Sequence, residues 1–279
     1  MNVRHQPGSP AARFDFGKNW QAFIRRLDPQ RIQEAERSLR EMLRVERLEG
    51  RSFLDVGSGS GLFSLAAVRL GASPVHSFDA DPESVACTRW LKDRFFPLRA
   101  DWTVGHGSIL DRGHLGRLGR FDVVYAWGVL HHTGAMWDAL DNTCGLVAPQ
   151  GALFASLYND QGYISRRWRK VKHIYNASPR PIRWALVCGV FLHWEFWPAI
   201  RRLLRLRTPV FLEKMRGYPR ERGMSYWHDL VDWVGGYPFE VARPEEVFDF
   251  CAARGFRLTG LKTVMGGHGC NEYLFLREG

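Results

Sequence analysis

The feature that most constrains this chain is a glycine-rich turn between an apolar run and a helical pattern. Residues 53–56 form a short apolar run that carries one acid, Asp55, and Gly57, Gly59 and Gly61 follow before a second apolar run begins at Leu62. Glycine lacks a Cβ atom, so this backbone can turn tightly and lie against a ligand. A strand, a glycine turn and a helix in this order predict the start of an α/β sheet that binds a nucleotide-like ligand.

A second acid follows at a spacing that supports the same interpretation. Residues 74–79 are predicted to form a second strand ending in Asp79, 18 positions after Gly61, close to the spacing of roughly 20 at which a carboxylate reaches a ribose hydroxyl. A dinucleotide-binding turn reads GxGxxG and holds a pyrophosphate at the helix N-terminus. Asp55, just before the first glycine, would repel a pyrophosphate but would suit an ammonium group.

This arrangement resembles the cofactor site of the class I S-adenosylmethionine-dependent methyltransferases, over residues 50–160 and 240–279. Residues 121–132 are similar to the family's fourth strand, and the histidines that follow it resemble those of small-molecule O-methyltransferases of the ubiquinone-biosynthesis type. The resemblance implies an α/β three-layer sandwich. Its seven-stranded, mostly parallel Rossmann-like sheet would have an antiparallel last strand, and a helical insertion or lid would be added to it.

The chain divides into four predicted parts. Within the first, Asp28 and Pro29 predict the start of a packing helix that Gly50 closes. The parts are an N-terminal leader and packing helix (1–50), a cofactor-binding core (51–160), a basic, aromatic-rich helical insertion that acts as lid or substrate region (161–240), and a C-terminal helix and strand pair (241–279).

The resemblance implies S-adenosyl-L-methionine as cofactor, S-adenosyl-L-homocysteine as product, and no metal. Many related enzymes carry an acid directly after the glycine equivalent to Gly107, where this chain has Ser108, and this departure weakens the assignment of the adenine pocket. The candidate cofactor-binding residues are Asp55, Gly57, Ser58, Gly59, Gly61, Asp79, Ala80, Ser108, Ile109 and Trp127.

Methyl transfer from a sulfonium is an in-line displacement, and a hydroxyl or enol acceptor also needs a base with a pKa near the working pH. Histidine fits that requirement. His131 and His132 follow the predicted fourth strand, and His268 lies in the glycine-rich turn between the last two strands; these three are the candidate catalytic residues. The alternative is that the histidine pair caps a helix or packs beneath the cofactor.

The acceptor is expected beyond the carboxyl ends of the strands. No Asn/Asp-Pro-Pro-Tyr/Phe or Pro-Cys motif follows the fourth strand, which disfavours planar amino groups of adenine or glutamine and a cysteine-dependent cytosine mechanism. An oxygen, carbon or amine of a metabolite, lipid or natural product remains. The candidate substrate residues are Phe16, Trp20, Tyr158, Asn159, Tyr226, Trp227 and Asn271; the aromatic residues among residues 14–20 could instead simply cover the sheet.

The net charge of +10 is concentrated in one segment. Residues 160–222 hold 15 Lys/Arg and four Asp/Glu, so the remainder of the chain is about neutral. Residues 184–207 are mostly apolar with trailing arginines, but His193, Glu195 and Pro198 interrupt the run of roughly 20 apolar residues that spans a bilayer. The segment predicts a substrate lid or a peripheral membrane contact; a helical cap buried against the domain is the alternative.

Three other functions stay open from the sequence. An RNA methyltransferase would use the basic segment to hold phosphates. A non-catalytic subunit would use the glycine turn to bind the cofactor without transferring its methyl group. A dehydrogenase is the third. Five scattered cysteines without a C-x-x-C motif and no signal-peptide pattern predict a reducing compartment. A cytoplasmic location with membrane association follows as the expectation, and the oligomeric state is left open.

Overall fold

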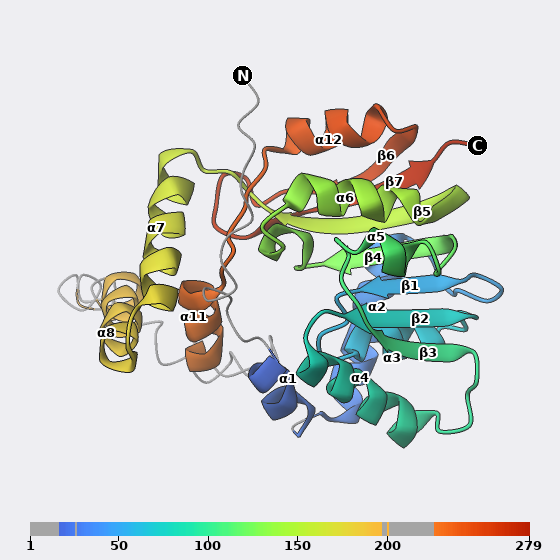
Figure 1. The fold of residues 1–279 in the computed structure, drawn as a ribbon, viewed down its shortest axis with the longest axis horizontal. Coiled ribbons are helices and arrows are strands. Elements are labelled where there is room, and N and C mark those ends of the chain that lie inside the picture. Colours follow the sequence, from blue (N-terminus) through green and yellow to red (C-terminus); the bar gives the residue numbers. More distant parts are fainter. Residues whose placement is uncertain (1–16, 26, 197–199, 201–225) are drawn as a thin grey trace. The chain divides into compact units, whose positions relative to one another are not determined.

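The computed structural model describes residues 17–25, 27–196, 200 and 226–279. Seven strands form one sheet in the order β3-β2-β1-β4-β5-β7-β6 (Figure 1). β1 pairs in parallel with β2 and β4, and β5 in parallel with β4, whereas β7 is antiparallel to both β5 and β6. The predicted fold class, a mostly parallel sheet with an antiparallel last strand, is confirmed.

The chain separates into two compact units. Among the described residues, the sheet unit holds residues 17–165 and 240–279, and the insertion unit holds residues from Arg166 to Phe239. The sheet unit contains α1 (Gly17–Ile24), α2 (Pro29–Leu43), β1 (Phe53–Val56), α3 (Leu62–Arg69), β2 (Val75–Asp79), α4 (Pro82–Phe95), β3 (Trp102–His106), α5 (Arg112–Leu115), β4 (Phe121–Trp127), the 3-10 turn η2 (Leu130–His132), α6 (Met136–Gly145), β5 (Val147–Tyr158), α12 (Pro244–Ala252), β6 (Phe256–Lys262) and β7 (Cys270–Arg277).

Apolar side chains cover both faces of the sheet, because successive residues of a strand point to opposite sides. Leu54 and Val56 of β1 belong to a core shared with α6 and α12, while Phe53 belongs to a second core shared with α2, α3 and α4. Asp55 points to this second side. The acid that precedes the glycine turn is therefore directed toward the helices beneath it.

The helix predicted from Asp28 begins as expected but ends earlier. The Asp28 carboxylate accepts a hydrogen bond from the Arg31 amide at 2.9 Å, with Pro29 in the first turn. The helix stops at Leu43, because Arg44 adopts a left-handed conformation with φ of 55°. The prediction that Gly50 closes this helix was wrong: the αL position at its C-terminus is taken by a non-glycine residue.

The insertion unit is built from α7 (Tyr163–Ala177), which begins at the end of the sheet unit, α8 (Arg180–Phe191), the π-helical turn η3 (Leu192–Phe196) and α11 (Tyr226–Gly235). Tyr175, Val187, Leu230 and Val234 form its apolar core. A cation is buried beside them: the Lys172 ammonium donates to the Trp233 carbonyl and lies 4.7 Å from the Trp233 ring centroid. A lysine surrounded by aromatic rings is stabilised by cation–π attraction.

Among the described residues, no helix combines the length and the apolar character needed to cross a bilayer. The insertion predicted at 161–240 overlaps the insertion unit over most of its length. Its role as a lid stays a prediction.

Candidate functional site

The backbone amides of the glycine turn are engaged within the protein. The amides of Gly57 and Ser58 both donate to the Phe78 carbonyl, at 2.8 and 3.0 Å, and the Gly61 amide donates to the Ser58 carbonyl at 2.7 Å. The Gly59 amide donates to the Asp79 carboxylate at 2.9 Å. A turn that binds a pyrophosphate presents free N–H groups to it. These four amides already have acceptors, so they fit that ligand poorly.

The turn is also closely packed where its glycines lack side chains. Gly57 has φ of +70°, and a Cβ atom there would lie 2.5 Å from the Val129 side chain. Gly61 has φ of +79°, and a Cβ atom would lie 2.8 Å from the Thr88 backbone of α4. Both positions therefore need glycine for conformation and for space. Val129 follows β4, so this contact brings the segment that carries His131 and His132 up to the turn.

Asp79 stands at the end of β2 and holds the loops around it. One carboxylate oxygen accepts from Gly59, as above, and the other accepts from the Asp81 amide at 2.9 Å. Burial raises the pKa of Asp79 above its usual value, and the two amides oppose this shift. The carboxylate thus joins the glycine turn to the start of α4, while carboxylate oxygens retain further acceptor capacity.

Asp55 lies beneath the turn in a buried polar network. Its side chain is 2% exposed and accepts from the Ser64 hydroxyl at 2.5 Å. The Ser64 and Ser77 hydroxyls are 2.7 Å apart, and the Trp102 indole donates to Ser77 at 3.0 Å. Burial is the main cause that raises the pKa of Asp55 to about 7, and the nearby charge of Asp79 adds to it. In the structure the carboxylate is directed to α3, and the predicted contact with an ammonium group stays a prediction.

The stability of the Asp55→Asn variant should depend less on pH than the stability of the wild type. The folded pKa of Asp55, about 7, lies above the ordinary aspartate pKa of about 3.9. The contribution of this group to stability is therefore greatest at low pH and falls as pH rises from about 4 to 7, by roughly 4 kcal/mol. The Tm difference between pH 5 and pH 8 in ligand-free protein should shrink by about 5 °C or more. Asp138→Asn, which replaces an exposed acid, is the control. A Tm difference between pH 5 and pH 8 in Asp55→Asn that equals that of the wild type would contradict the prediction.

Trp20 lies over the glycine turn. A Cβ atom on Gly59 would lie 3.1 Å from the Trp20 indole, so this side chain of α1 packs against the bare α-carbon. Phe16, the other candidate in the leader, lies outside the described residues. Val129, Trp20 and Thr88 thus border the turn.

The remaining cofactor candidates have different environments. Ala80 is exposed and its carbonyl lies 3.1 Å from the His106 ring nitrogen, while Ser108 is half-buried and its hydroxyl accepts from the Leu110 amide. Ile109 is buried in the core shared with α6. Trp127 is exposed, with its indole donating to Glu272 at 3.3 Å. Their contacts with a cofactor stay predictions.

The two histidines after β4 form an aromatic cluster with the end of β5. The His131 and Tyr158 ring centroids are 4.0 Å apart, those of His131 and His132 are 4.5 Å apart, and those of His132 and Tyr158 are 5.5 Å apart. His131 is 1% exposed, whereas His132 is half-buried. Of the two, His132 is the ring that solvent or a ligand can reach.

Sequence reasoning missed Glu240, which links this cluster to the neighbouring helix. The Glu240 amide donates to the His131 carbonyl at 3.0 Å, and its carboxylate accepts from the Met136 amide at 3.1 Å. The carboxylate thus caps α6, whose N-cap residue Ala135 supplies no side-chain acceptor. Two residues further along the same segment, the Ala242 amide donates to the Tyr158 carbonyl at 3.0 Å. The sequence signal was weak, because Glu240 lies near the start of α12 at Pro244 but caps a helix 104 positions earlier in the chain.

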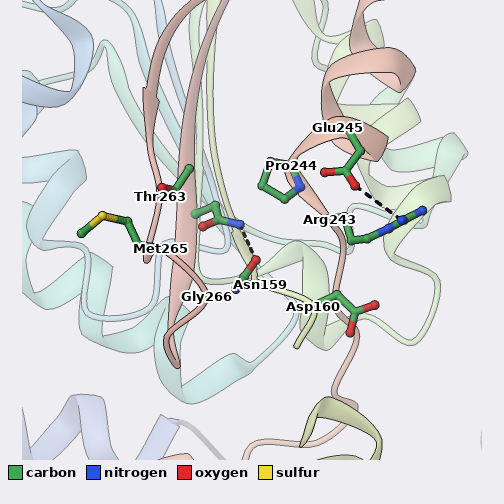
Figure 2. A pocket seen from close by; sticks show the side chains of 9 residues that line it. Asn159, Asp160, Arg243, Pro244, Glu245, Thr263, Met265 and Gly266 are labelled. Carbon is green, nitrogen blue, oxygen red and sulfur yellow. Dashed lines mark hydrogen bonds and ion pairs between the residues drawn. The ribbon is translucent and has the colours of Figure 1, made fainter. Parts of the chain in front are cut away.

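A pocket of about 360 Å³ opens beyond β5. Its lining residues are Asn159, Asp160, Arg243, Pro244, Glu245, Thr263, Met265, Gly266 and Asn271 (Figure 2). The buried Asn271 amide donates to the Asn159 side chain at 3.0 Å and accepts from the Val264 backbone, so the two predicted substrate residues are paired. Figure 2 also shows Arg243 paired with Glu245, at 3.5 Å.

The remaining candidates are His268 and two residues of α11. His268 is exposed in the turn between β6 and β7, where partial burial lowers its pKa. Tyr226 and Trp227 begin α11 in the insertion unit, and their side chains lie outside the described part of the chain. No cluster of three or more metal-binding side chains is found in the described residues.

A family model described as a methyltransferase domain matches residues 26–207, well over half of the chain. The chain belongs to this methyltransferase family. The solved structure of magnesium protoporphyrin IX methyltransferase from Synechocystis, with bound S-adenosylhomocysteine, superposes on this methyltransferase chain with a TM-score of 0.51 at 13% identity, covering 95% of this chain and 89% of that one. At this identity the similarity concerns the fold, and it agrees with the class I arrangement of the sheet.

Curated relatives of this methyltransferase match over shorter stretches. The ribosomal protein L11 methyltransferase of Methylococcus capsulatus is 48% identical over 48 residues, which are 17% of this chain and 16% of the relative. The tRNA U34 carboxymethyltransferase of the same organism is 31% identical over 143 residues, 49% of this chain and 43% of the relative. The chain therefore spans less than half the length of either relative.

Proposed function

We propose that this protein transfers the methyl group of S-adenosyl-L-methionine to an oxygen of a small-molecule or lipid-like acceptor. A carbon or an amine nitrogen of such an acceptor is the alternative. The observation that carries the proposal is the glycine turn, whose amides already have acceptors and whose neighbour is Asp79. Such a turn suits the uncharged ribose and the short polar tail of an adenosyl sulfonium better than a pyrophosphate. The S-adenosylhomocysteine in the similar solved structure supports the same cofactor.

The residues present fit this cofactor. Asp79 would accept ribose hydroxyls while keeping the turn in place through Gly59, and Ser108 and Ile109 would border the base. Trp20 and Trp127 offer aromatic faces, and cations are attracted to such faces. When bound, the cofactor supplies an electrophilic methyl group. The protein's task is then to align the acceptor, and positioning of that kind contributes about 7–11 kcal/mol.

His132 is the proposed general base. Its half-buried ring lies in the cluster with His131 and Tyr158, three residues after the Val129 side chain that packs at the turn. The His132 nitrogen would take the proton of an acceptor hydroxyl as the oxygen attacks the methyl group. The buried His131 would hold that ring in place, and the exposed His268 is the alternative base.

The acceptor side of the proposal rests on the pocket beyond β5. Asn159 and Asn271 would offer hydrogen bonds to polar groups of a metabolite, and Tyr158, the residue before Asn159, contacts the two histidines. The magnesium protoporphyrin IX methyltransferase is named for a small-molecule acceptor, which supports this class. A cytoplasmic location with peripheral membrane contact through residues 184–207 is part of the proposal.

An RNA methyltransferase is the second candidate. The basic segment 160–222 favours it, and one relative is named for a tRNA substrate while another is named for a ribosomal protein. Retention on RNA that weakens steeply with salt would support it over a small acceptor.

Calorimetric titration tests the cofactor directly. S-adenosylhomocysteine should bind at least tenfold more tightly than NAD⁺ or NADP⁺, because the engaged turn amides cannot receive a pyrophosphate. Preference for a nicotinamide dinucleotide would overturn the proposal. Labelled S-adenosylmethionine, incubated with fractionated cell extract, then identifies the acceptor, and binding without any transfer would indicate a non-catalytic cofactor-binding subunit.

A further inference from the structure

The outer face of α8 is an apolar stripe. Trp184 is 56% exposed and Leu192, the first residue of η3, is 43% exposed. Cys188 lies between them and is also exposed. These three positions are spaced by four residues, so they fall on one side of a helix. η3 continues the helix to Phe196, which is 47% exposed.

The stripe lies on the side of α8 that faces away from the apolar core of the insertion unit. The opposite side of α8, with Val187 and Leu186, already packs in the core that α7 and α11 share. A surface helix of a water-soluble domain normally carries polar residues on its outer side. α8 is instead apolar on both sides, and contiguous apolar surface of this kind marks an interaction site.

The exposed charge beside the stripe is positive. Residues 163–191, from the start of α7 to the end of α8, contain seven Lys/Arg and no Asp or Glu, and the one acid of η3, Glu195, is buried. On α7, Arg166 and Lys170 are exposed at a four-residue spacing, and Arg180 is exposed at the start of α8. Lys172 is the exception, since it is buried among aromatic rings. The surface of α7 and α8 therefore combines exposed apolar side chains with cations that no acid of this segment neutralises.

We propose that the outer surfaces of α7 and α8 dock on a bilayer that contains anionic lipids. Trp184 and Leu192 enter the headgroup and acyl boundary, and Arg166, Lys170 and Arg180 lie against lipid phosphates. Interfacial helices have this pairing of an apolar side with basic residues. An RNA partner would use the cations but would leave an aliphatic and aromatic stripe in water. This docking rests on the membrane contact of the proposed function and gives it a surface and a lipid class, and it can be tested separately from methyl transfer.

Sedimentation with sucrose-loaded vesicles tests the proposal on the full chain. The protein should bind vesicles of phosphatidylcholine with 30% phosphatidylglycerol at least tenfold more tightly than vesicles of phosphatidylcholine alone, because each cation near an anionic surface adds to the attraction. The Arg166→Gln, Lys170→Gln, Arg180→Gln triple variant and the Trp184→Ser, Leu192→Ser double variant should each lose at least tenfold of this affinity.

Matched controls come from the sheet unit. Arg112→Gln, Arg117→Gln, Arg120→Gln removes three exposed cations, and Trp90→Ser, Leu98→Ser removes an exposed Trp and Leu pair; both should bind vesicles as the wild type does. Quenching by brominated lipid should decrease in Trp184→Phe, which keeps the stripe apolar. Circular dichroism and S-adenosylhomocysteine titration of every variant report folding and cofactor binding separately, so failure of the docking is distinguishable from failure of the cofactor assignment.

Three outcomes would overturn the docking surface. One is wild-type protein that stays in the supernatant with anionic vesicles. Another is unchanged vesicle affinity in the Trp184→Ser, Leu192→Ser variant, which would mean that charge alone is responsible. The third is binding of a structured RNA, lost in the cation triple variant, with no binding of vesicles, which would assign these cations to a nucleic acid.

Discussion

Replacing His132 by alanine is expected to lower kcat by about 10²- to 10⁴-fold, the usual contribution of a positioned general base. S-adenosylhomocysteine affinity should change less than twofold, because the ring lies in the cluster with His131 and Tyr158 and none of the turn's hydrogen bonds involves it. Single-turnover rates with labelled cofactor, measured beside calorimetric titration, separate the two effects.

His132→Gln distinguishes a base from a packing residue. Glutamine fills similar space and forms hydrogen bonds, but it does not accept a proton at neutral pH. Its kcat should fall as far as that of His132→Ala. Near-normal turnover in His132→Gln would show that the ring only packs against Tyr158, and a large loss confined to His268→Ala would move the base to the turn between β6 and β7.

Replacing Asp79 by alanine should weaken cofactor binding by about 1.5–3 kcal/mol for each charge-assisted hydrogen bond lost, on the order of 10- to 150-fold in Kd. A second cause acts in the same direction, because the variant also frees the Gly59 and Asp81 amides. Asp79→Asn keeps one acceptor oxygen, so its cofactor affinity should lie between those of Asp79→Ala and the wild type. Isothermal titration with S-adenosylhomocysteine measures all three.

Asp111→Ala is the matched control for Asp79. Asp111 is also an acid that follows a strand and accepts from backbone amides, those of Gly113 and His114 at the start of α5. Loss of that cap should cost stability of about 1 kcal/mol and leave cofactor affinity as in the wild type. Equal losses of affinity in Asp79→Ala and Asp111→Ala would mean that unfolding, and not ribose contact, explains the result.

The sheet and the turn were predictable because their signals are local. Gly57, Gly59 and Gly61 directly follow an apolar strand, and the caps Asp28 and Asp81 act within three residues of themselves. The end of α2 was not predictable in the same way, since Arg44 occupies the αL conformation that glycine usually takes. The seven-stranded, mostly parallel sheet was expected from the family resemblance and not from spacing, and the order of its strands was not predicted.

The finer parts of the site depend on contacts distant in sequence. Nothing in the sequence indicated that Asp55 is hydrogen-bonded to Ser64 and, through it, linked to Ser77; its contact with an ammonium group stays a prediction. Pairing of Asn159 with Asn271 joins residues 112 positions apart, and no periodic pattern encodes such a pair. Composition did reveal the basic segment, but only the helix geometry separates the exposed cations from the buried Lys172.

The two segments of the sheet unit that flank the insertion unit in sequence are hydrogen-bonded to each other. The Asp160 amide donates to the Ala242 carbonyl at 3.1 Å, and the Ala242 amide donates to the Tyr158 carbonyl at 3.0 Å. A segment that leaves and re-enters through one paired junction can be exchanged or lengthened in evolution while the strands around the glycine turn stay intact.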